Sequence, residues 1–492
     1  MRQSLSLGLL LALGLLAVVP VAAVDAVPPL PAGDAGTANA AAVERWPTAE
    51  IVPRVACRAE PEHTYALYLP SSYVPGRPMP ILYQFDARQR GPFAAERFRA
   101  AAEELGYILA SSNESRSDGP WKPNIDTMKA MWDDTHARFA LDPRRVYAAG
   151  YSGGARTATL LALARPGEVA GVIGCGGGFP VDRPPDASTL FAFFGAAGVR
   201  DFNYEELRKL DLALAALGKA HRFEVFDGGH EWCSAPVATQ ALRWMNLLAM
   251  RDGALGRVDA FVEAEWRDQA AAAETLATAG DPLRAARRYA EMARDFSGLR
   301  DVAAAVTAKQ RIEASAEHQS ALAAEASAAR EAEEYGPEAA RILHQALVDP
   351  DSVHLPILLK QLRVPALQQR AADGGSAYSS QAARRLLEVL YVQTAYYVPT
   401  ELEKKHDFAR AALSLRVATA VKPEQPGGWY ALACVLAPAG DKHGALAALT
   451  QAIEHGFDDA AALANEPALA RIRGEKQFRG LLDQLKRRAA AG

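Results

Sequence analysis

Residues 51–250 alternate short apolar runs with segments of helix length, and this alternation constrains the fold more than any other feature of the sequence. It is typical of an α/β protein, in which helices cover a mostly parallel sheet. The first two runs, 51–56 and 65–69, predict an initial antiparallel pair. The later strands are predicted at 81–85, 107–110, 146–149, 171–174, 190–194 and 223–226, and the helices at 94–105, 125–139, 155–163, 204–217 and 237–250.

A tight turn of small residues follows the apolar run 146–149. Residues 150–154 read Gly-Tyr-Ser-Gly-Gly, which matches the pattern G-x-S-x-G, and a helix-like segment begins directly after them. Between a strand and a helix this pattern indicates a nucleophile elbow, which presents the serine at the end of the strand. The alternative is a strand–helix turn with an incidental serine. The setting favours the elbow, so Ser152 is the predicted nucleophile.

A serine nucleophile needs a histidine within hydrogen-bond reach, and the histidine needs a carboxylate that holds it in place. In a mostly parallel sheet such groups gather at the carboxyl ends of the strands. Between Ser152 and residue 250 the sequence holds two histidines, His221 and His230. Because His221 precedes the strand 223–226 and His230 follows it, His230 is the predicted base.

The predicted acid is Asp201, which follows the strand 190–194 and preserves the chain order serine, acid, histidine. Asp182, after the preceding strand, is the reserve. Asp227 stands so close to His230 that a role in shaping the turn is favoured for it. A carboxylate that merely caps the following helix is the alternative for Asp201.

Acyl transfer also needs two donors for the oxyanion, fixed before the reaction begins. The backbone N–H of Gly153, directly after the nucleophile, is the first predicted donor. The second is expected in the turn after the strand 81–85, where Ala87 is favoured and Asp86 and Arg88 remain open. Aromatic residues near the site are predicted to line a substrate pocket, with simple packing as the alternative; they are Tyr151, Trp121 and Trp232.

Three segments, 151–156, 195–204 and 228–232, together resemble the α/β-hydrolase superfamily. Within it they are similar to the secreted esterases related to polyhydroxybutyrate depolymerases and feruloyl esterases. The resemblance covers residues 47–250 and implies an α/β-hydrolase fold. It also implies a serine esterase that works through an acyl-enzyme without cofactor or metal ion, with Ser152 as nucleophile, Asp201 as acid and His230 as base.

Two other functions remain open for the same residues. The related prolyl-oligopeptidase catalytic domains imply a peptidase as one alternative. The other is a binding protein, in which the hydrolase unit is a non-catalytic scaffold and the C-terminal helices carry the role. A complete set of nucleophile, acid and base argues against the scaffold. The leading hypothesis is an esterase with a small or oligomeric ester as substrate, and the peptidase remains open.

A second domain is expected because 492 residues exceed what one hydrophobic core usually accommodates. Strand signals end near residue 252, so we predict a catalytic domain at 47–252 and an all-α domain at 253–492. Apolar residues recur there with the 34-residue period of tetratricopeptide repeats. They are Ala411, Leu415, Ala418 and Pro423, then Ala445, Leu449, Ala452 and Phe457, with Trp429, Leu432, Ala433 and Leu436 between them.

The helical-repeat prediction extends to a further helical hairpin near 260–297, because Gly280-Asp281 resembles Gly440-Asp441. In contrast, the segment 387–402 is irregular for a repeat helix. A plain helical bundle is the alternative architecture. A repeat domain would offer a concave surface to a protein partner, or cap the hydrolase and restrict access to it.

The N-terminal residues resemble a targeting signal rather than part of a folded domain. Residues 1–26 combine a charged start, an apolar core and small residues at the end, as a signal peptide does. The apolar core at 5–19 is shorter than the roughly 20 residues of a membrane-spanning helix. We therefore predict an exported protein, periplasmic or secreted, without a membrane span after cleavage, and a Pro/Ala-rich tail at 27–46.

The net charge of the chain limits the classes of partner that can be expected. The formal net charge of −4 and the lack of a long basic run argue against nucleic acid as a binding partner.

The sequence has four cysteines, which are too few and too dispersed for a disulfide framework, and none has metal-ligand spacing. A Cys175–Cys233 disulfide and isolated buried thiols both remain open, and the other two cysteines are Cys57 and Cys434.

Overall fold

The computed structural model describes residues 45–117, 120–373 and 377–491, so the predicted signal peptide and residues 27–44 of the predicted tail lie outside the described residues. The chain divides into two compact units, the first ending at Glu325 and the second beginning at Ala326. The domain boundary predicted at 252 and 253 stays a prediction. It coincides with the end of α6 (Ala235–Arg251), inside the first unit.

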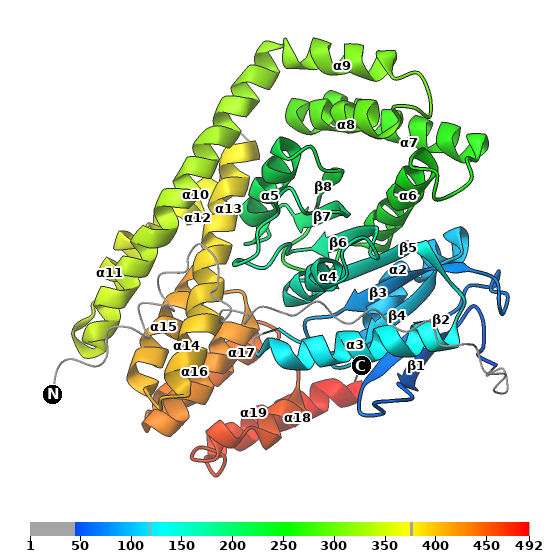
Figure 1. Cartoon of the computed structure of the whole chain (residues 1–492). Helices are drawn as coiled ribbons and strands as arrows, with labels where there is room; N and C mark the ends of the chain where they lie inside the picture. The colour runs from blue at the N-terminus through cyan, green and yellow to red at the C-terminus, as the bar shows by residue number, and fades with distance from the viewer. Residues whose placement is uncertain (1–44, 118–119, 374–376, 492) are drawn as a thin grey trace. The chain divides into compact units, whose positions relative to one another are not determined.

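The first unit is built on an eight-stranded sheet with the strand order β1-β2-β4-β3-β5-β6-β7-β8 (Figure 1). β1 is antiparallel to β2 and β2 to β4, whereas all the remaining pairs are parallel. The predicted initial pair and the mostly parallel sheet are thus confirmed. The strands are β1 (Ile51–Ala56), β2 (Thr64–Tyr68), β3 (Met79–Phe85), β4 (Ile108–Ser112), β5 (Leu141–Tyr151), β6 (Gly171–Cys175), β7 (Ala192–Gly198) and β8 (His221–Phe226).

Helices cover both faces of this sheet. On one face, Ile81 and Tyr83 of β3 pack in the hydrophobic core that includes α3, α4 and α5. Leu82, between them, points to the other face and packs in the core that includes α2 and α6. The two-residue period of a strand thus divides an apolar run between two cores. The helices are α2 (Gly91–Leu105), α3 (Trp121–Arg138), α4 (Gly153–Ala164) and α5 (Tyr204–Ala216), with α6 as above.

The strand predicted at 190–194 is displaced in the structure, where β7 spans Ala192–Gly198. Leu190 is 63% exposed and lies before the strand, although its apolar side chain suggested otherwise. The last four residues of β7 read Gly-Ala-Ala-Gly, and such small residues have low β-propensity. A glycine is required at position 198, because a Cβ there would overlap the backbone of residues 228 and 229.

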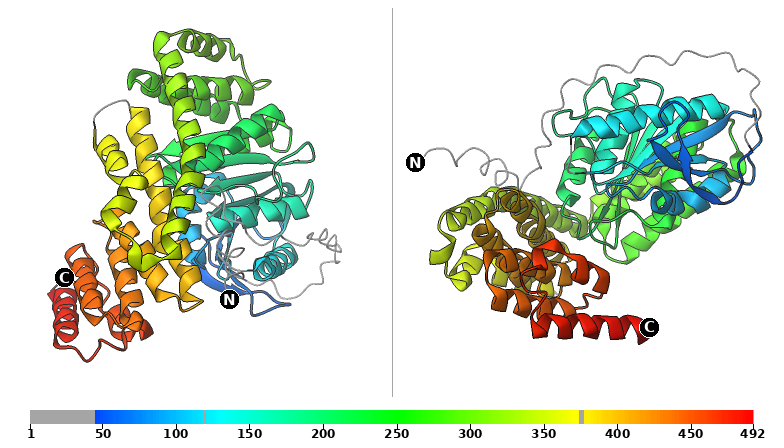
Figure 2. Two further views of the ribbon diagram at one scale, coloured as in Figure 1. Left: turned by 90° about the vertical axis from the view of Figure 1, so that its left-hand side faces the viewer. Right: turned by 90° about the horizontal axis from the view of Figure 1, so that it is seen from below.

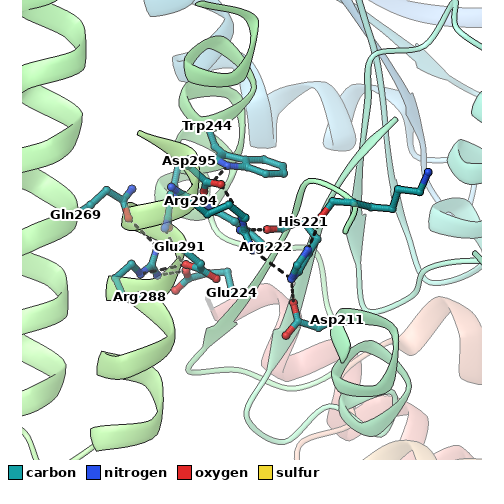
Figure 3. Close-up of polar contacts among 12 residues, drawn as sticks. Asp211, His221, Arg222, Glu224, Trp244, Gln269, Arg288, Glu291, Arg294 and Asp295 are labelled. Carbon is teal, nitrogen blue, oxygen red and sulfur yellow. Dashed lines mark hydrogen bonds and ion pairs between the residues drawn. The ribbon is translucent and has the colours of Figure 1, made fainter. Parts of the chain in front are cut away.

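The predicted helical hairpin near 260–297 is present as α7 (Asp259–Thr278) and α8 (Pro282–Asp295). These helices and α9 (Ala303–Glu313) share a hydrophobic core with the end of α6. Arginines of α8 also cover the edge strand β8. Arg284 donates a 2.6 Å hydrogen bond to the carbonyl of Val225. Arg294 donates a hydrogen bond to the carbonyl of His221, and both residues are labelled in Figure 3. Edge carbonyls are thereby removed from unwanted strand pairing.

In the described part of the second unit, all the regular secondary structure is helical (Figure 2). The residues with the 34-residue period lie on α15 (Phe408–Val421) and α17 (Lys442–Glu454), where Ala411 and Ala445 are both fully buried. This burial fits the predicted repeat, which stays a prediction. The other elements are α10 (Ala316–Val348), which begins in the first unit, η1 (Pro350–Ser352), α11 (Leu355–Gln361), α12 (Val364–Ala372), α13 (Ala377–Val392), η2 (Gln393–Tyr397), α14 (Val398–Glu403), α16 (Pro426–Ala439), α18 (Ala460–Asn465), η3 (Pro467–Leu469) and α19 (Lys476–Ala491).

The irregular segment at 387–402 contains the π-helical turn η2, which separates α13 from α14. Pro399, at the start of α14, has no N–H to donate within this continuous helical stretch, and the carbonyl of Thr394 accepts a 2.9 Å hydrogen bond from the hydroxyl of Ser414. Across the described ranges of the whole chain, every helix falls short of the combined length and apolar character that crossing a lipid bilayer requires.

Candidate active site

Ser152 occupies the turn between β5 and α4 and has an unusual backbone conformation, with φ of 55° and ψ of −121°. A positive φ costs a non-glycine residue about 1–3 kcal/mol, so the surrounding structure must hold it in place. The neighbouring glycines make that possible. A Cβ on Gly150 would overlap the carbonyl of Gly154, and a Cβ on Gly154 would overlap the carbonyl of Phe85. Both glycines of the G-x-S-x-G pattern are therefore sterically required.

The structure brings the side chains of Ser152, His230 and Asp201 together. Nε2 of His230 lies 2.9 Å from Oγ of Ser152, and Nδ1 lies 2.8 Å from Oδ1 of Asp201. The three residues follow β5, β8 and β7, so they meet at the carboxyl edge of the sheet, as expected. His230 retains 16% exposure of its side chain, whereas Asp201 is fully buried. This geometry suits proton transfer from the hydroxyl to the imidazole.

Asp201 is held by its own loop and by the glycine-rich stretch after β6. The backbone N–H of Asn203 donates a 2.8 Å hydrogen bond to Oδ1 of Asp201, and the Asn203 side chain donates to the carbonyl of Gly176. Gly176 has φ of 60°, and a Cβ there would lie 3.0 Å from Oδ2 of Asp201 and from Nδ1 of His230. The acid–histidine pair thus rests directly against this glycine.

The other residues weighed for these roles lie elsewhere. Asp182 is exposed in the connection between β6 and β7. Asp227 is 88% exposed at its side chain and forms an ion pair with Arg200, 2.7 Å between Oδ1 and Nη1. His221 is the first residue of β8, at the opposite end of that strand from the site. Among the described residues, Asp201 is therefore the carboxylate that contacts Nδ1 of His230.

The predicted oxyanion donors also lie close to one another. The N–H of Ser117 donates a 3.0 Å hydrogen bond to the carbonyl of Ala87, and a Cβ on Gly153 would overlap Oγ of Ser117. The N–H groups of Gly153 and Ala87 make no hydrogen bond to any described residue. The N–H of Arg88, in contrast, already donates to Oδ1 of Asp86 at 2.7 Å. Gly153 and Ala87 are thus left as free donors.

The three predicted pocket aromatics differ in their surroundings. Tyr151 is 5% exposed, and its hydroxyl donates a 2.6 Å hydrogen bond to the carbonyl of His230. Burial raises the pKa of the Tyr151 hydroxyl well above its ordinary value, so it remains a neutral donor. Trp232 is 4% exposed and donates to Asp86, whereas Trp121 begins α3 at the margin of a hydrophobic core. Their role as a pocket lining stays a prediction.

Sequence reasoning missed Phe202, Asn203 and Gly176. The ring of Phe202 packs against that of His230, with 4.1 Å between centroids. Adjacency to Asp201 was the available signal for Phe202 and Asn203, because a catalytic carboxylate needs neighbours that fix it. No sequence pattern singled out Gly176, because its role depends on its contact with Asp201 and His230, which lie on other loops.

Two buried thiols lie below the site. Sγ of Cys175 and Sγ of Cys233 are 3.0 Å apart, and both residues are fully buried free cysteines. The hydrogen bond with Cys175, together with burial, raises the pKa of the Cys233 thiol well above its ordinary value. The carbonyl of Cys175 also accepts a 2.9 Å hydrogen bond from the N–H of Ser152, so this thiol pair adjoins the elbow.

The described residues that cluster as metal ligands would are Glu60, Glu62 and His63, in the connection between β1 and β2. They belong to no part of the Ser152 site. The cluster is partly exposed, and acidic groups of this kind are common at protein surfaces.

No protein-family model and no curated protein matches the chain. Solved structures that are similar to it include an S-formylglutathione hydrolase from Staphylococcus aureus, with 16% identity and a TM-score of 0.33 over 41% of this chain and 98% of that one. An esterase from Pyrobaculum calidifontis has 14% identity and a TM-score of 0.35, over 41% and 87% of the two chains. A ferulic acid esterase has 17% identity and a TM-score of 0.32, over 39% and 95%.

Proposed function

We propose that this protein is a serine hydrolase that cleaves carboxylic esters through an acyl-enzyme intermediate. The observation that carries the proposal is the unbroken hydrogen-bonded series from Oγ of Ser152 through the imidazole of His230 to the buried carboxylate of Asp201. The strained backbone of Ser152 at the end of β5 supports the same function, because strain of this kind clusters at active sites.

In the first half-reaction, Oγ of Ser152 attacks the ester carbonyl while Nε2 of His230 takes the hydroxyl proton. Asp201 stays ionised and stabilises the imidazolium. The oxyanion of the tetrahedral intermediate accepts hydrogen bonds from the N–H groups of Gly153 and Ala87. Loss of one such donor typically costs about 100-fold to 1,000-fold in kcat.

The intermediate then collapses as His230 gives its proton to the departing alcohol, which leaves the acyl group on Ser152. In the second half-reaction His230 takes a proton from water, and the resulting hydroxide equivalent attacks the acyl carbonyl. Release of the acid returns the proton to Oγ of Ser152. Each proton thus passes through Nε2 of His230, the atom that lies 2.9 Å from Oγ.

The proposal is tested by labelling the folded chain with a fluorophosphonate probe and by assaying short p-nitrophenyl esters beside aminoacyl amides. We expect label on Ser152 and hydrolysis of the esters, and we expect Ser152→Ala to lose both. Ser188→Ala is the matched control, since Ser188 is an exposed serine in the connection between β6 and β7, and it should behave as wild type. An unlabelled Ser152 in folded protein would favour a non-catalytic scaffold, and cleavage of amides alone would favour a peptidase.

We also propose export, on the residue pattern of 1–26. Expression with the full leader in a bacterial host should yield a mature chain that begins near residue 27, and intact mass gives the cleavage point. A chain that keeps its N-terminal methionine and its leader would contradict export.

A further inference from the structure

Asp86 is a fully buried carboxylate in the connection between β3 and α2. Its Oδ1 accepts hydrogen bonds from the N–H of Arg88 at 2.7 Å and from Nε of Arg90 at 3.0 Å. Its Oδ2 accepts from Nη2 of Arg90 at 2.9 Å. Ala87 stands between Asp86 and these partners in the chain, so the carboxylate fixes the turn that carries the proposed oxyanion donor.

The same carboxylate reaches the loop that carries His230. Nε1 of Trp232, two residues beyond His230, donates a 2.7 Å hydrogen bond to Oδ2 of Asp86. The Trp232 ring packs against Tyr151, with 5.9 Å between centroids, and the Tyr151 hydroxyl in turn holds the carbonyl of His230. Asp86 is therefore bonded to both loops at once.

The two loops follow strands that lie far apart in the sheet, so the hydrogen bond between Asp86 and Trp232 links parts that strand pairing does not. β3 and β8 are separated by β5, β6 and β7 in the strand order, so no strand pairing joins the two loops directly. Burial alone would raise the pKa of Asp86. The hydrogen bonds from Arg90, Trp232 and the backbone of Arg88 outweigh burial, and the pKa lies below its ordinary value. Hydrogen bonds to an ionised acceptor are about twice as strong as neutral ones.

We propose that Asp86 is a positioning residue for the reaction proposed above: it holds the N–H of Ala87 and the imidazole of His230 in register through Trp232. The inference rests on the proposed function, because it assigns no separate activity. Asp86 touches none of the reacting atoms. Its effect is to fix the distance between an oxyanion donor and a base that come from distant strands, and misplacement by about 1 Å can cost roughly 100-fold in rate.

Two variants separate positioning from mere stabilisation of the fold. Trp232→Phe keeps an aromatic ring and removes only the N–H donor, and Asp86→Asn keeps the shape of the side chain and removes its charge. One sample of each variant is labelled to completion with a fluorophosphonate to count its reactive sites. The kcat for a short p-nitrophenyl ester is measured on an unlabelled sample and expressed per reactive site. We expect complete labelling with a loss of about tenfold in kcat for Trp232→Phe and about 100-fold for Asp86→Asn, with KM little changed.

Asp134→Asn is the matched control. Asp134 is also a buried carboxylate paired with the arginine four residues later, with 2.6 Å between its Oδ2 and Nε of Arg138. Asp134 also accepts a hydrogen bond from the hydroxyl of Tyr65. Asp134 lies on α3 and Tyr65 on β2, so this cluster is not part of the Ser152 site. This variant should lower the thermal unfolding temperature and leave kcat per reactive site unchanged.

The possible failures are distinct. If Asp86→Asn and Trp232→Phe lose activity only in proportion to their labelled fraction, as Asp134→Asn should, Asp86 is a structural residue and the inference is overturned. If the wild-type chain takes no label and cleaves no ester, the proposed function fails and the inference fails with it.

Discussion

Arg222 of β8 and Asp295 of α8 form an ion pair that is almost completely removed from solvent. Nε and Oδ2 are 2.8 Å apart, and the two side chains are 2% and 0% exposed (Figure 3). Asp295 also accepts hydrogen bonds from the indole of Trp244 and from Arg294, each at 2.9 Å. The helix α8, which lies beyond the predicted catalytic domain, is thus bonded to the edge of the sheet by buried charge.

Replacing Asp295 by Asn should destabilise the first unit strongly. Nη1 and Nη2 of Arg222 are buried without a hydrogen-bond partner among the described residues, so the variant leaves a buried guanidinium without its direct carboxylate partner. Breaking a buried ion pair in this way typically costs about 3–5 kcal/mol. Urea unfolding measures the loss. Asp126→Asn, which breaks the exposed pair with Lys122, is the control and should change the free energy of unfolding far less.

The same carboxylate predicts how stability depends on pH. Burial would raise the pKa of Asp295, but the charges of Arg222 and Arg294 outweigh burial and lower it. The folded state therefore binds fewer protons at this group than the unfolded state near the ordinary aspartate pKa of about 3.9. The stabilisation is complete above that pH and is lost as the pH falls through the folded pKa. Urea unfolding at several acidic pH values should show a steeper loss for wild type than for Asp295→Asn, and equal slopes would contradict this assignment.

A methyl group at Gly176 should impair the site more than the fold. A Cβ there would lie 3.0 Å from both Asp201 and His230, so Gly176→Ala must displace the acid–histidine pair. We expect a loss of about 100-fold in ester hydrolysis per folded molecule. Gly167→Ala is the matched control, because Gly167 also has a positive φ, 80°, but has no atom within 4 Å of the added Cβ. Circular dichroism establishes the folded fraction, and equal activity of the two variants would rule out the proposed displacement.

Local pattern carries the information that made parts of this molecule predictable. The strands and their mostly parallel arrangement follow from short apolar runs that alternate with segments of helix length. The G-x-S-x-G pattern selected Ser152, and chain order and strand ends favoured Asp201 and His230; the structure places the three side chains within hydrogen-bond distance. The position of β7 was missed, because its last four residues have low β-propensity and the close approach of residues 228 and 229 to Gly198 cannot be seen in the sequence.

Contacts between distant residues left no such pattern. Trp232 and Asp86 are 146 positions apart, and Arg222 and Asp295 are 73 apart. Each residue alone resembles an ordinary loop, strand or helix residue, and its role exists only once the chain has folded. The attachment of α8 to the sheet and the hydrogen bond between the loops that carry Asp86 and Trp232 therefore required the structure.

Oxidation should join Cys175 and Cys233. Their Sγ atoms are 3.0 Å apart, and a disulfide needs them about 1 Å closer. With oxidised glutathione present during refolding, one sulfur–sulfur bond forms, both thiol protons leave, and the two electrons reduce the glutathione disulfide to two thiols. We expect the intact mass to fall by about 2 Da. Alkylation in denaturant should then modify Cys57 and Cys434 only, and alkylation of all four cysteines would show that the pair remains reduced.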